Sequence, residues 1–259
     1  MMYSKSIFSQ DEIVQNYYSV KERMKIAAES VDRDAETINL IVVTKTFDSM
    51  EIQPLINLGH RDYGENKVQE AEHKWIDIKE KNPEINLHLI GHLQTNKVKR
   101  ALTLFDSIHT LDSKKIFVEI LKHINKPSSV TKEFFIEVNL GNEPQKYGLA
   151  QEEIPMLFEG QKFQDQVNFS GLMCIPPYNE APSPYFALLS KIANKFEIKG
   201  LSMGMSSDFE KAIQFGATHI RVGSEIFGFE IMNINQIIKI LKKTDSFGIQ
   251  TDSFLNTLA

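Results

Sequence analysis

Leu40-Ile41-Val42-Val43-Thr44-Lys45-Thr46 is the stretch that decides the fold of this chain. Five consecutive β-branched or aliphatic residues in it end directly at a lysine. Such a run is typical of a strand that is buried on both faces, as strands of parallel sheets are. It predicts a parallel α/β fold with Lys45 at the carboxyl end of a central strand, the edge where such folds carry out their chemistry.

The amine of Lys45 has two interpretations. A lysine in water is protonated at neutral pH and is then not a nucleophile. Burial and neighbouring cations favour the neutral amine, which can attack a carbonyl group to form a Schiff base. Alternatively, Lys45 only ends the strand, with its stem over apolar surface and its ammonium group in water. The rest of the chain has to distinguish these two roles.

Length and composition exclude several classes of protein. The chain has 259 residues, and α/β barrels occupy about 250 residues as a single domain. Its net charge of −5 is unlike the basic excess of nucleic-acid-binding proteins. No apolar segment approaches the roughly 20 residues that span a bilayer, and the amino terminus lacks the apolar core of a secretory signal. We expect a cytoplasmic protein that binds neither nucleic acid nor a membrane.

Short apolar runs alternate with longer amphipathic ones along most of the chain. A helical pattern over residues 11–31 precedes the first strand. We predict strands over 39–45, 62–64, 87–91, 107–111, 134–139, 169–175, 200–205 and 220–224. We predict further helices over 50–58, 67–79, 96–104, 113–124, 151–160, 184–196, 207–215 and 235–242. Eight strands, each followed by a helix, predict a closed (β/α)8 TIM barrel of the α/β class with an extra amino-terminal helix.

An open, doubly wound sheet is the alternative architecture. It would need fewer strands, and its nucleotide-binding motif G-x-G-x-x-G is absent from the sequence. No low-complexity linker divides the chain. We therefore expect a single domain over residues 1–244 and a loosely held tail over residues 245–259.

Polar residues follow the second and third predicted strands. Asn66 comes directly after Tyr63-Gly64-Glu65 and is either a helix N-cap or part of a site. The run His88-Leu89-Ile90-Gly91-His92-Leu93-Gln94-Thr95-Asn96-Lys97 contains two histidines, but no third ligand is placed to complete a metal shell. The single cysteine, Cys174 in the sixth strand, excludes an intramolecular disulfide and is expected to be a buried small hydrophobe.

The seventh and eighth predicted strands end in residues that suit an anion. Ser207 and Glu210 match an S-x-x-E capping box, which would leave the hydroxyl of Ser206 and the first helix amides available. Gly223 lets the backbone approach a ligand closely, and Ser224 adds a hydroxyl group. The simpler interpretation is a helix cap and a tight turn. However, barrels often bind phosphate after these two strands, which together with a strand-end lysine suggests a phosphorylated aldehyde such as pyridoxal 5′-phosphate.

Six motifs of the chain occur in the order and spacing found in the pyridoxal phosphate homeostasis protein family, which the chain resembles from about residue 10 to residue 230. The motifs are Thr44-Lys45-Thr46, Tyr63-Gly64-Glu65-Asn66, the run from His88 to Lys97, Gly171-Leu172-Met173, Leu201-Ser202-Met203-Gly204-Met205-Ser206 and Arg221-Val222-Gly223-Ser224-Glu225-Ile226-Phe227-Gly228. This family is built like the amino-terminal barrel of alanine racemase, so the resemblance implies a pyridoxal-phosphate-binding barrel of fold type III.

The resemblance also implies which residues bind the cofactor. Lys45 would form the Schiff base with pyridoxal 5′-phosphate. The other residues that it implies are Asn66, Met203, Ser206, Arg221, Gly223 and Ser224. Within this set, the two serines and the glycine would hold the phosphate, and Arg221 would face the pyridine nitrogen. A cation there disfavours protonation of the ring and makes it a weaker electron sink. No catalytic residue and no metal ligand is implied.

Three functions of different classes are consistent with these residues. By resemblance, the protein carries and buffers pyridoxal phosphate for vitamin B6 and amino-acid homeostasis, with apo-enzymes as its partners. The second is a racemase or decarboxylase with Tyr63 or His92 as a second acid. The third is a lysine Schiff-base aldolase without a cofactor. Alanine racemase takes its second acid from an additional β domain that this chain is too short to contain, so we expect slow or absent racemisation and a monomer.

Overall fold

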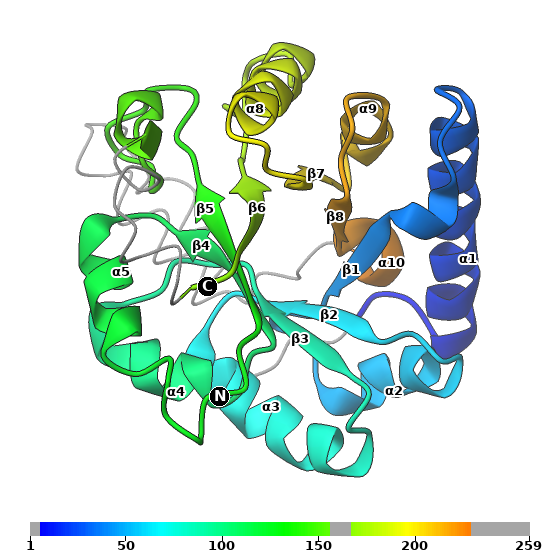
Figure 1. Ribbon diagram of the computed structural model, residues 1–259. Coiled ribbons are helices and arrows are strands. Elements are labelled where there is room, and N and C mark those ends of the chain that lie inside the picture. Colours follow the sequence, from blue (N-terminus) through cyan, green and yellow to red (C-terminus); the bar gives the residue numbers. More distant parts are fainter. Residues whose placement is uncertain (1–5, 156–166, 229–259) are drawn as a thin grey trace, which may run out of the picture.

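The eight predicted strands form a closed parallel barrel. The computed structural model describes residues 6–155 and 167–228, and its strands follow one another around the barrel in sequence order from β1 to β8. The barrel closes because β8 pairs in parallel with β1, with His219 opposite Asn39 and Val222 opposite Val42. Figure 1 shows the helices arranged around the outside of this ring. The predicted architecture is therefore confirmed.

The bounds of the elements agree with the predicted pattern to within a few residues. The strands are β1 (Asn39–Val43), β2 (Asp62–Glu65), β3 (Asn86–Leu89), β4 (Ser107–Leu111), β5 (Glu133–Glu137), β6 (Phe169–Met173), β7 (Gly200–Met205) and β8 (His219–Val222). The described α-helices are α1 (Gln10–Glu29), α2 (Ser49–Asn57), α3 (Val68–Lys81), α4 (Val98–Leu102), α5 (Lys114–Leu121), α8 (Ser183–Lys195), α9 (Phe209–Gln214) and α10 (Ser224–Phe227). Short 3-10 helices are η1 (Ala35–Thr37), η2 (Thr95–Lys97) and η3 (Gln151–Glu153).

Some predicted segments cannot be compared with the structure. The helix over 235–242, the second half of the helix over 151–160 and the tail over 245–259 lie outside the described residues. Among the helices that are described, none is long and apolar enough to cross a bilayer.

Five strands, β1, β3, β5, β6 and β8, end two residues earlier than predicted, and β1 and β8 are the two that carry predicted site residues. β1 stops at Val43 because the chain then turns: the amide of Phe47 donates to the carbonyl oxygen of Thr44 at 3.2 Å, and Thr46 has a φ of 69°. β8 stops at Val222, and Ser224 already belongs to α10. Lys45 and Ser224 therefore lie in the segments that follow the strands.

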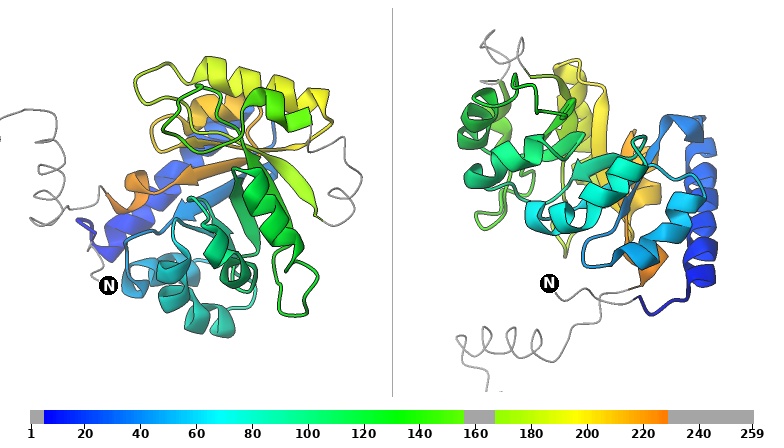
Figure 2. Two further views of the ribbon diagram at one scale, coloured as in Figure 1. Left: turned by 90° about the vertical axis from the view of Figure 1, so that its left-hand side faces the viewer. Right: turned by 90° about the horizontal axis from the view of Figure 1, so that it is seen from below.

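The extra amino-terminal helix is α1. Its first turn is held by a capping box in which Ser9 Oγ accepts from the amide of Glu12 at 3.3 Å and the Glu12 carboxylate accepts from the amide of Ser9 at 2.8 Å. Its buried face packs against α9, α10 and α2. Figure 2 shows from two further sides that α1 lies along the outside of the barrel. It covers the seam where β8 meets β1.

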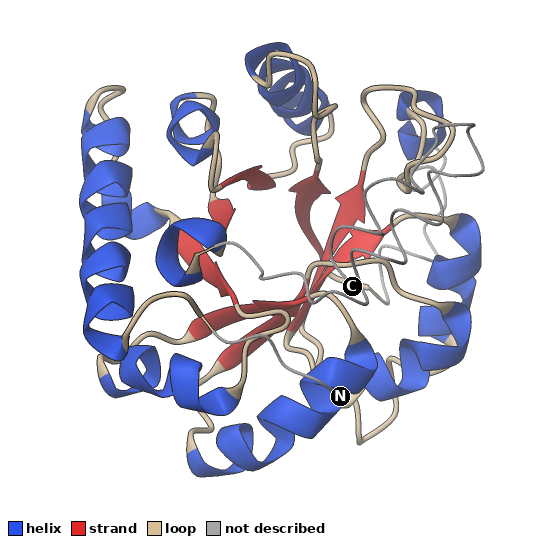
Figure 3. Ribbon diagram, turned by 180° about the vertical axis from the view of Figure 1, so that it is seen from behind, coloured by secondary structure: helices blue, strands red, loops and turns tan. Residues whose placement is uncertain are grey.

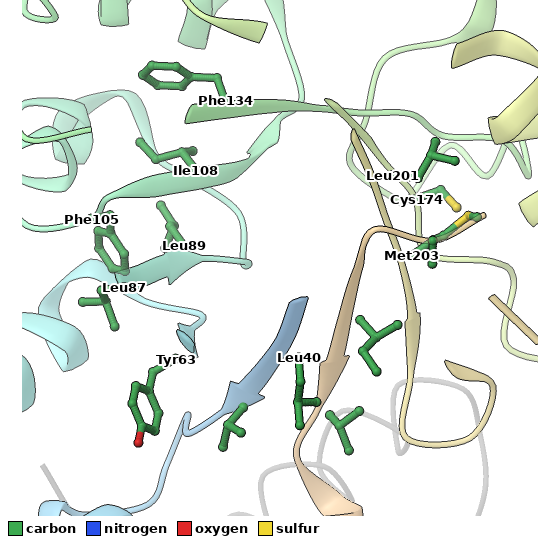
Figure 4. Packing of buried hydrophobic residues seen from close by; sticks show 14 of the residues in the cluster. Leu40, Tyr63, Leu87, Leu89, Phe105, Ile108, Phe134, Cys174, Leu201 and Met203 are labelled. Atoms are coloured by element: carbon green, nitrogen blue, oxygen red, sulfur yellow. The ribbon is translucent and has the colours of Figure 1, made fainter. Parts of the chain in front are cut away.

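Apolar side chains fill the layer between the strands and the helices. Along β1, Leu40 and Val42 point into this layer, because alternate residues of a strand face opposite sides of the sheet. Figure 3 shows the strands ringed by helices, and Figure 4 shows residues of the intervening layer, including Leu40, Tyr63 and Leu89. This continuous layer holds the helices on the barrel.

The interior of the barrel is more polar than the outer layer. Its largest apolar side chain, Phe135, is stacked on His109 with ring centroids 4.1 Å apart and lies edge-on to His219 at 4.9 Å. Gly171 and Gly200 make room for this ring, since a Cβ on Gly171 would lie only 2.3 Å from it. Barrels usually fill this space with branched aliphatic residues. This barrel instead contains the buried histidines His109 and His219 there, and a buried polar ring needs hydrogen-bond partners.

Candidate functional site

Lys45 lies in a turn that begins directly after β1. The next residue, Thr46, has a φ of 69°, a conformation that residues other than glycine rarely adopt. Its amide donates to the carboxylate of Glu70 on α3. This contact holds the chain in the strained turn and fixes the backbone next to Lys45, whose side chain is half-buried.

A buried ion pair between Lys74 of α3 and Glu65 of β2 supports the same turn. Lys74 Nζ lies 2.8 Å from Glu65 Oε1 and donates to the carbonyl oxygen of Thr44 at 2.7 Å. Glu65 Oε1 also accepts from Thr44 Oγ1 at 2.6 Å and from Trp75 Nε1 at 2.9 Å. The side chains of Lys74 and Glu65 are 1% and 0% exposed. Burial raises the pKa of Glu65, and the ammonium of Lys74 opposes that rise.

Sequence reasoning missed this ion pair, although a signal was present. Glu70 and Lys74 are spaced i, i+4 and fall on the helix face that also carries the buried Ala71 and Trp75. Charged residues on an apolar face are expected to be paired when they are buried. The sequence could not show that Lys74 also pairs with Glu65, at the end of β2.

Asn66 follows β2 and does not cap a helix. The N-cap of α3 is Lys67, without a side-chain cap hydrogen bond, so the N-cap interpretation of Asn66 is wrong. Instead, its backbone packs against Gly91 after β3, where a Cβ would lie 2.4 Å from the Asn66 carbonyl oxygen. Within the described part of the chain, the half-buried amide side chain of Asn66 forms no hydrogen bond.

The two proposed second acids have different positions. Tyr63 is fully buried in the outer layer, where its hydroxyl donates to the His60 carbonyl oxygen at 3.3 Å. Tyr63 is thus on the outer face of β2 and is not a second acid at the barrel mouth, which corrects that hypothesis. His92 lies after β3, with Nδ1 2.5 Å from Asp112 Oδ2 and its ring stacked on Tyr147 at 3.7 Å.

The ends of β7 and β8 come together as the sequence predicts. The amide of Gly223 donates to Ser206 Oγ at 3.3 Å, and both residues are half-buried, as is Ser224 beside them. A Cβ on Gly223 would lie 3.1 Å from the carbonyl oxygen of Val43, so the glycine also lets this segment approach β1. Ser206, Gly223 and Ser224 therefore lie on the same rim as Lys45.

The predicted capping box at Ser207 and Glu210 is wrong. The helix α9 begins at Phe209, after the N-cap Asp208, because the turn that follows β7 is longer than the motif assumes. Asp208 Oδ1 accepts from the amide of Met205 at 2.6 Å and thereby fixes this turn. The carboxylate of Glu210 pairs instead with Arg23 on α1 at 2.6 Å.

Arg221 is buried inside the barrel, with 4% of its surface exposed. Its Nη1 donates to Ser202 Oγ at 2.6 Å, and its Nη2 donates to the carbonyl oxygen of Cys174 at 3.1 Å. Burial lowers its pKa, and the nearby Glu137 and Asp208 oppose that effect. Among the described residues, no carboxylate pairs with it within 4.0 Å. The guanidinium is thus held by neutral oxygens.

A chain of hydrogen bonds runs from Arg221 across the interior to the amino-terminal end of the barrel. Ser202 Oγ lies 2.8 Å from His109 Nδ1, and His109 Nε2 lies 3.1 Å from His88 Nδ1. His88 Nε2 in turn lies 3.1 Å from Asp62 Oδ1, at the first residue of β2. Burial lowers the pKa of His109 well below the usual range, so this histidine is neutral at pH 7.

The two ends of this chain set the direction of its hydrogen bonds. An arginine can only donate, so Ser202 accepts from Arg221 and passes its own hydrogen to His109 Nδ1. His109 then donates through Nε2 to His88, which donates through Nε2 to the carboxylate of Asp62. The chain therefore orients Arg221 by a series of donors that all point away from it.

Glu137, the last residue of β5, is buried beside Arg221 and Asp112. Burial and the carboxylate of Asp112 raise the pKa of Glu137 to about 7, although Arg221 opposes the rise. Asp112 Oδ1 is buried without a hydrogen-bond partner among the described residues. Sequence reasoning did not single out Glu137, because one glutamate after an apolar run is a common pattern.

Met203 and Cys174 lie on the other side of the barrel wall. Both belong to the buried outer layer, and Figure 4 shows them close to Leu201. Because residues alternate along β7, the side chain of Met203 points away from the interior that Ser202 faces. Cys174 is buried as expected, but it follows β6 instead of lying within it.

Comparisons with known proteins identify relatives of this chain. The family model described as the alanine racemase N-terminal domain matches residues 16–230. The pyridoxal phosphate homeostasis protein of Aquifex aeolicus is 38% identical over 218 residues, which cover 81% of this chain and 94% of that protein. That of Pseudomonas aeruginosa is 33% identical over 222 residues, which cover 83% of this chain and 95% of that protein.

A solved structure agrees with these relatives. PipY of Synechococcus elongatus, described with pyridoxal phosphate bound, is 31% identical, with a TM-score of 0.68 and coverage of 81% of this chain and 100% of that chain. Over most of its length, this chain is thus similar to a protein that is described with pyridoxal phosphate bound.

We expect that removing one partner of the Glu65–Lys74 pair strongly destabilises the protein. Replacing Lys74 by Met would leave the Glu65 carboxylate buried without its counter-ion and should lower the free energy of unfolding by about 3–5 kcal/mol. Chemical denaturation measures this change. Lys122→Met removes one partner of an exposed pair with Glu119 and should have a much smaller effect. Equal effects of the two substitutions would contradict the importance of the buried pair.

Glu137 should make the stability depend on pH. The native state keeps the Glu137 proton up to a pH of about 7, whereas the unfolded chain loses it near the ordinary value of 4.5. Between these values the native state binds more protons, so its stability should fall as the pH rises, by at most about 3 kcal/mol. Urea unfolding at a series of pH values would measure this slope. It should be shallower in Glu137→Gln and unchanged in Asp77→Asn, which removes an exposed carboxylate.

Proposed function

This chain belongs to the pyridoxal phosphate homeostasis proteins of the alanine racemase N-terminal domain family, and on this premise we propose that it binds pyridoxal 5′-phosphate at the carboxyl end of its barrel. It would hold the cofactor covalently and contribute to vitamin B6 and amino-acid homeostasis. When bound, the cofactor supplies an aldehyde that reacts with amines and a ring that can accept electrons.

The residues on the barrel rim fit this cofactor. Lys45 stands at the end of β1 on a turn that Glu70 and the Glu65–Lys74 pair keep in place, and its amine would form the covalent link. On the neighbouring strand ends, the hydroxyl of Ser206 and the amide of Gly223 are already within 3.3 Å of each other. A phosphate bound there would receive donors from both strand ends.

The single observation that carries the proposal is the state of Arg221. Its guanidinium is buried and is held by Ser202 and a backbone carbonyl, without a carboxylate within ion-pair distance in the described residues. A positive charge at the pyridine nitrogen would disfavour protonation of the ring and weaken it as an electron sink. This favours a protein that holds the cofactor over one that turns substrate over rapidly.

The resemblance also implies three further residues, Ser224, Asn66 and Met203. We propose that Ser224 contributes to phosphate binding and that the amide of Asn66 contacts the cofactor. The side chain of Met203 faces the outer layer, so only its backbone could take part.

Lys45 gives the direct test of cofactor attachment. Purified protein incubated with pyridoxal 5′-phosphate should show a visible absorbance band, and mass spectrometry after borohydride reduction should find the cofactor on Lys45. Lys45→Ala should lose both signals, because it removes the amine that forms the link. Lys67→Ala removes an exposed lysine near Asn66 and should keep both. A band that persists in Lys45→Ala would refute the assignment.

A second candidate function is amino-acid conversion, and Glu137 is the observation in its favour. A buried carboxyl group with a pKa of about 7 beside Arg221 has the proton affinity that a general acid or base needs. His92, paired with Asp112 on the same rim, remains available for such a role.

Cofactor transfer distinguishes the two functions. We propose that the protein acts as a monomer in the cytoplasm and passes its cofactor to apo-enzymes. Mixing the loaded protein with an apo-enzyme that needs pyridoxal phosphate should restore the activity of that enzyme while the absorbance of the loaded protein falls. L-Alanine added to the loaded protein should give no more D-alanine than a protein-free control with cofactor. Steady racemisation that disappears in Glu137→Gln would favour the second function.

A further inference from the structure

A cavity of about 280 Å³ lies at the amino-terminal end of the barrel, opposite the rim that carries Lys45. Six of its lining residues are the first residues of their strands: Asn39, Asp62, Asn86, Ser107, Glu133 and His219. The proposed cofactor site does not use any of them. All six are polar; Asn39 and Asn86 are exposed, whereas Ser107 and His219 are buried.

Ser107 is the first sign that the cavity holds a ligand. The residue is 1% exposed, and its hydroxyl has no hydrogen-bond partner in the described part of the chain. A buried hydroxyl without a partner loses its hydration and gains nothing in return. Because Ser107 lines the cavity, rotation of its side chain toward a polar group bound there would give its hydroxyl the missing partner.

Asp62 provides the charge. Its Oδ1 accepts from His88 Nε2 at 3.1 Å and from Asn86 Nδ2 at 3.2 Å, while its Oδ2 has no partner among the described residues. Burial favours the neutral acid, but the hydrogen bonds from His88 and Asn86 outweigh it and lower the pKa of Asp62. The carboxylate is therefore ionised at neutral pH and has one oxygen available.

The other groups around the cavity also favour a cation. Glu133 adds a second carboxylate, and the ring of His219 is neutral, because burial lowers its pKa to about 3. The amide nitrogen of Asn39 is engaged with His219 Nε2 at 3.0 Å and that of Asn86 with Asp62, which leaves both amide oxygens as acceptors. The cavity thus offers mainly acceptors and negative charge, with Lys132 as the cation in its wall.

We propose that this cavity is a second binding site, for a small organic cation that carries N–H donors, with the carboxylate of Asp62 and the hydroxyl of Ser107 as its principal contacts. An ammonium or guanidinium group supplies donors without acceptors, which matches the groups present. The proposal does not depend on the cofactor, because it involves neither Lys45 nor the rim.

Methylguanidinium chloride is a suitable probe, because it does not form a stable imine with an aldehyde and can be used with the unmodified full-length protein. Isothermal titration calorimetry against sodium chloride at equal ionic strength should show saturable binding at one site. Asp62→Asn should weaken binding by about tenfold or more, since it removes a charge-assisted hydrogen bond. Asp77→Asn, which removes an exposed carboxylate from α3, should leave binding unchanged.

Ser107→Ala keeps the test valid if Asp62→Asn fails to fold. It removes a hydroxyl that has no partner in the described residues, so its melting temperature should match that of the wild type or exceed it. It should nevertheless weaken methylguanidinium binding by about threefold or more. Methylammonium, titrated into Lys45→Ala to prevent reaction at the rim, distinguishes an ammonium site from a guanidinium site. The absence of saturable binding of both cations, or equal binding by Ser107→Ala and the wild type, would overturn the proposal.

Discussion

The parallel pairing of β8 with β1 is the constraint on which the rest of the structure depends. It turns an open sheet into a closed ring, so the carboxyl ends of all eight strands meet at one rim and the amino ends at the other. Gly223 permits the close approach of this seam to Val43 on the carboxyl side. The helix α1 covers the seam from outside and is anchored there by Arg23, which pairs with Glu210 and Glu225.

Closure also removes the polar groups inside the barrel, such as Ser202, His109 and Arg221, from water. Eight short strands enclose little space, and Phe135 fits only because Gly171 and Gly200 lack side chains. Five polar residues, from Arg221 through Ser202, His109 and His88 to Asp62, form one hydrogen-bonded chain that connects the two ends of the barrel. The rim with Lys45 is the cofactor site that we propose. The cavity at the amino-terminal end is lined by His88 and Asp62, the last two residues of this hydrogen-bonded chain.

The relation between Lys45 and its surroundings shows how a site depends on residues far from it in sequence. The turn that carries this lysine is supported by Glu65 from β2 and by Glu70 and Lys74 from α3. A buried charge pair contributes little net stability compared with apolar residues, but breaking it is costly. The pair therefore acts mainly to fix one conformation of the turn, and that conformation directs the lysine.

The sequence by itself determined the architecture and most of the rim. Apolar runs followed by amphipathic ones specify strands and helices locally, and eight of each pattern specify a closed barrel. The motifs after β1, β7 and β8 pointed to Lys45, Ser206, Gly223 and Ser224 as candidate site residues, and the family resemblance added Arg221, which lies within β8. Local patterns failed where a short motif has several possible partners, as with the capping box at Ser207 and the N-cap at Asn66. Only the tertiary structure decided that Met203 faces outward, that Glu65 pairs with Lys74, and that Glu137 and Asp62 lie at opposite ends of a buried polar interior. The reason is that burial and pairing depend on which side of the closed wall a residue occupies, and on neighbours that the chain brings together only when the barrel closes.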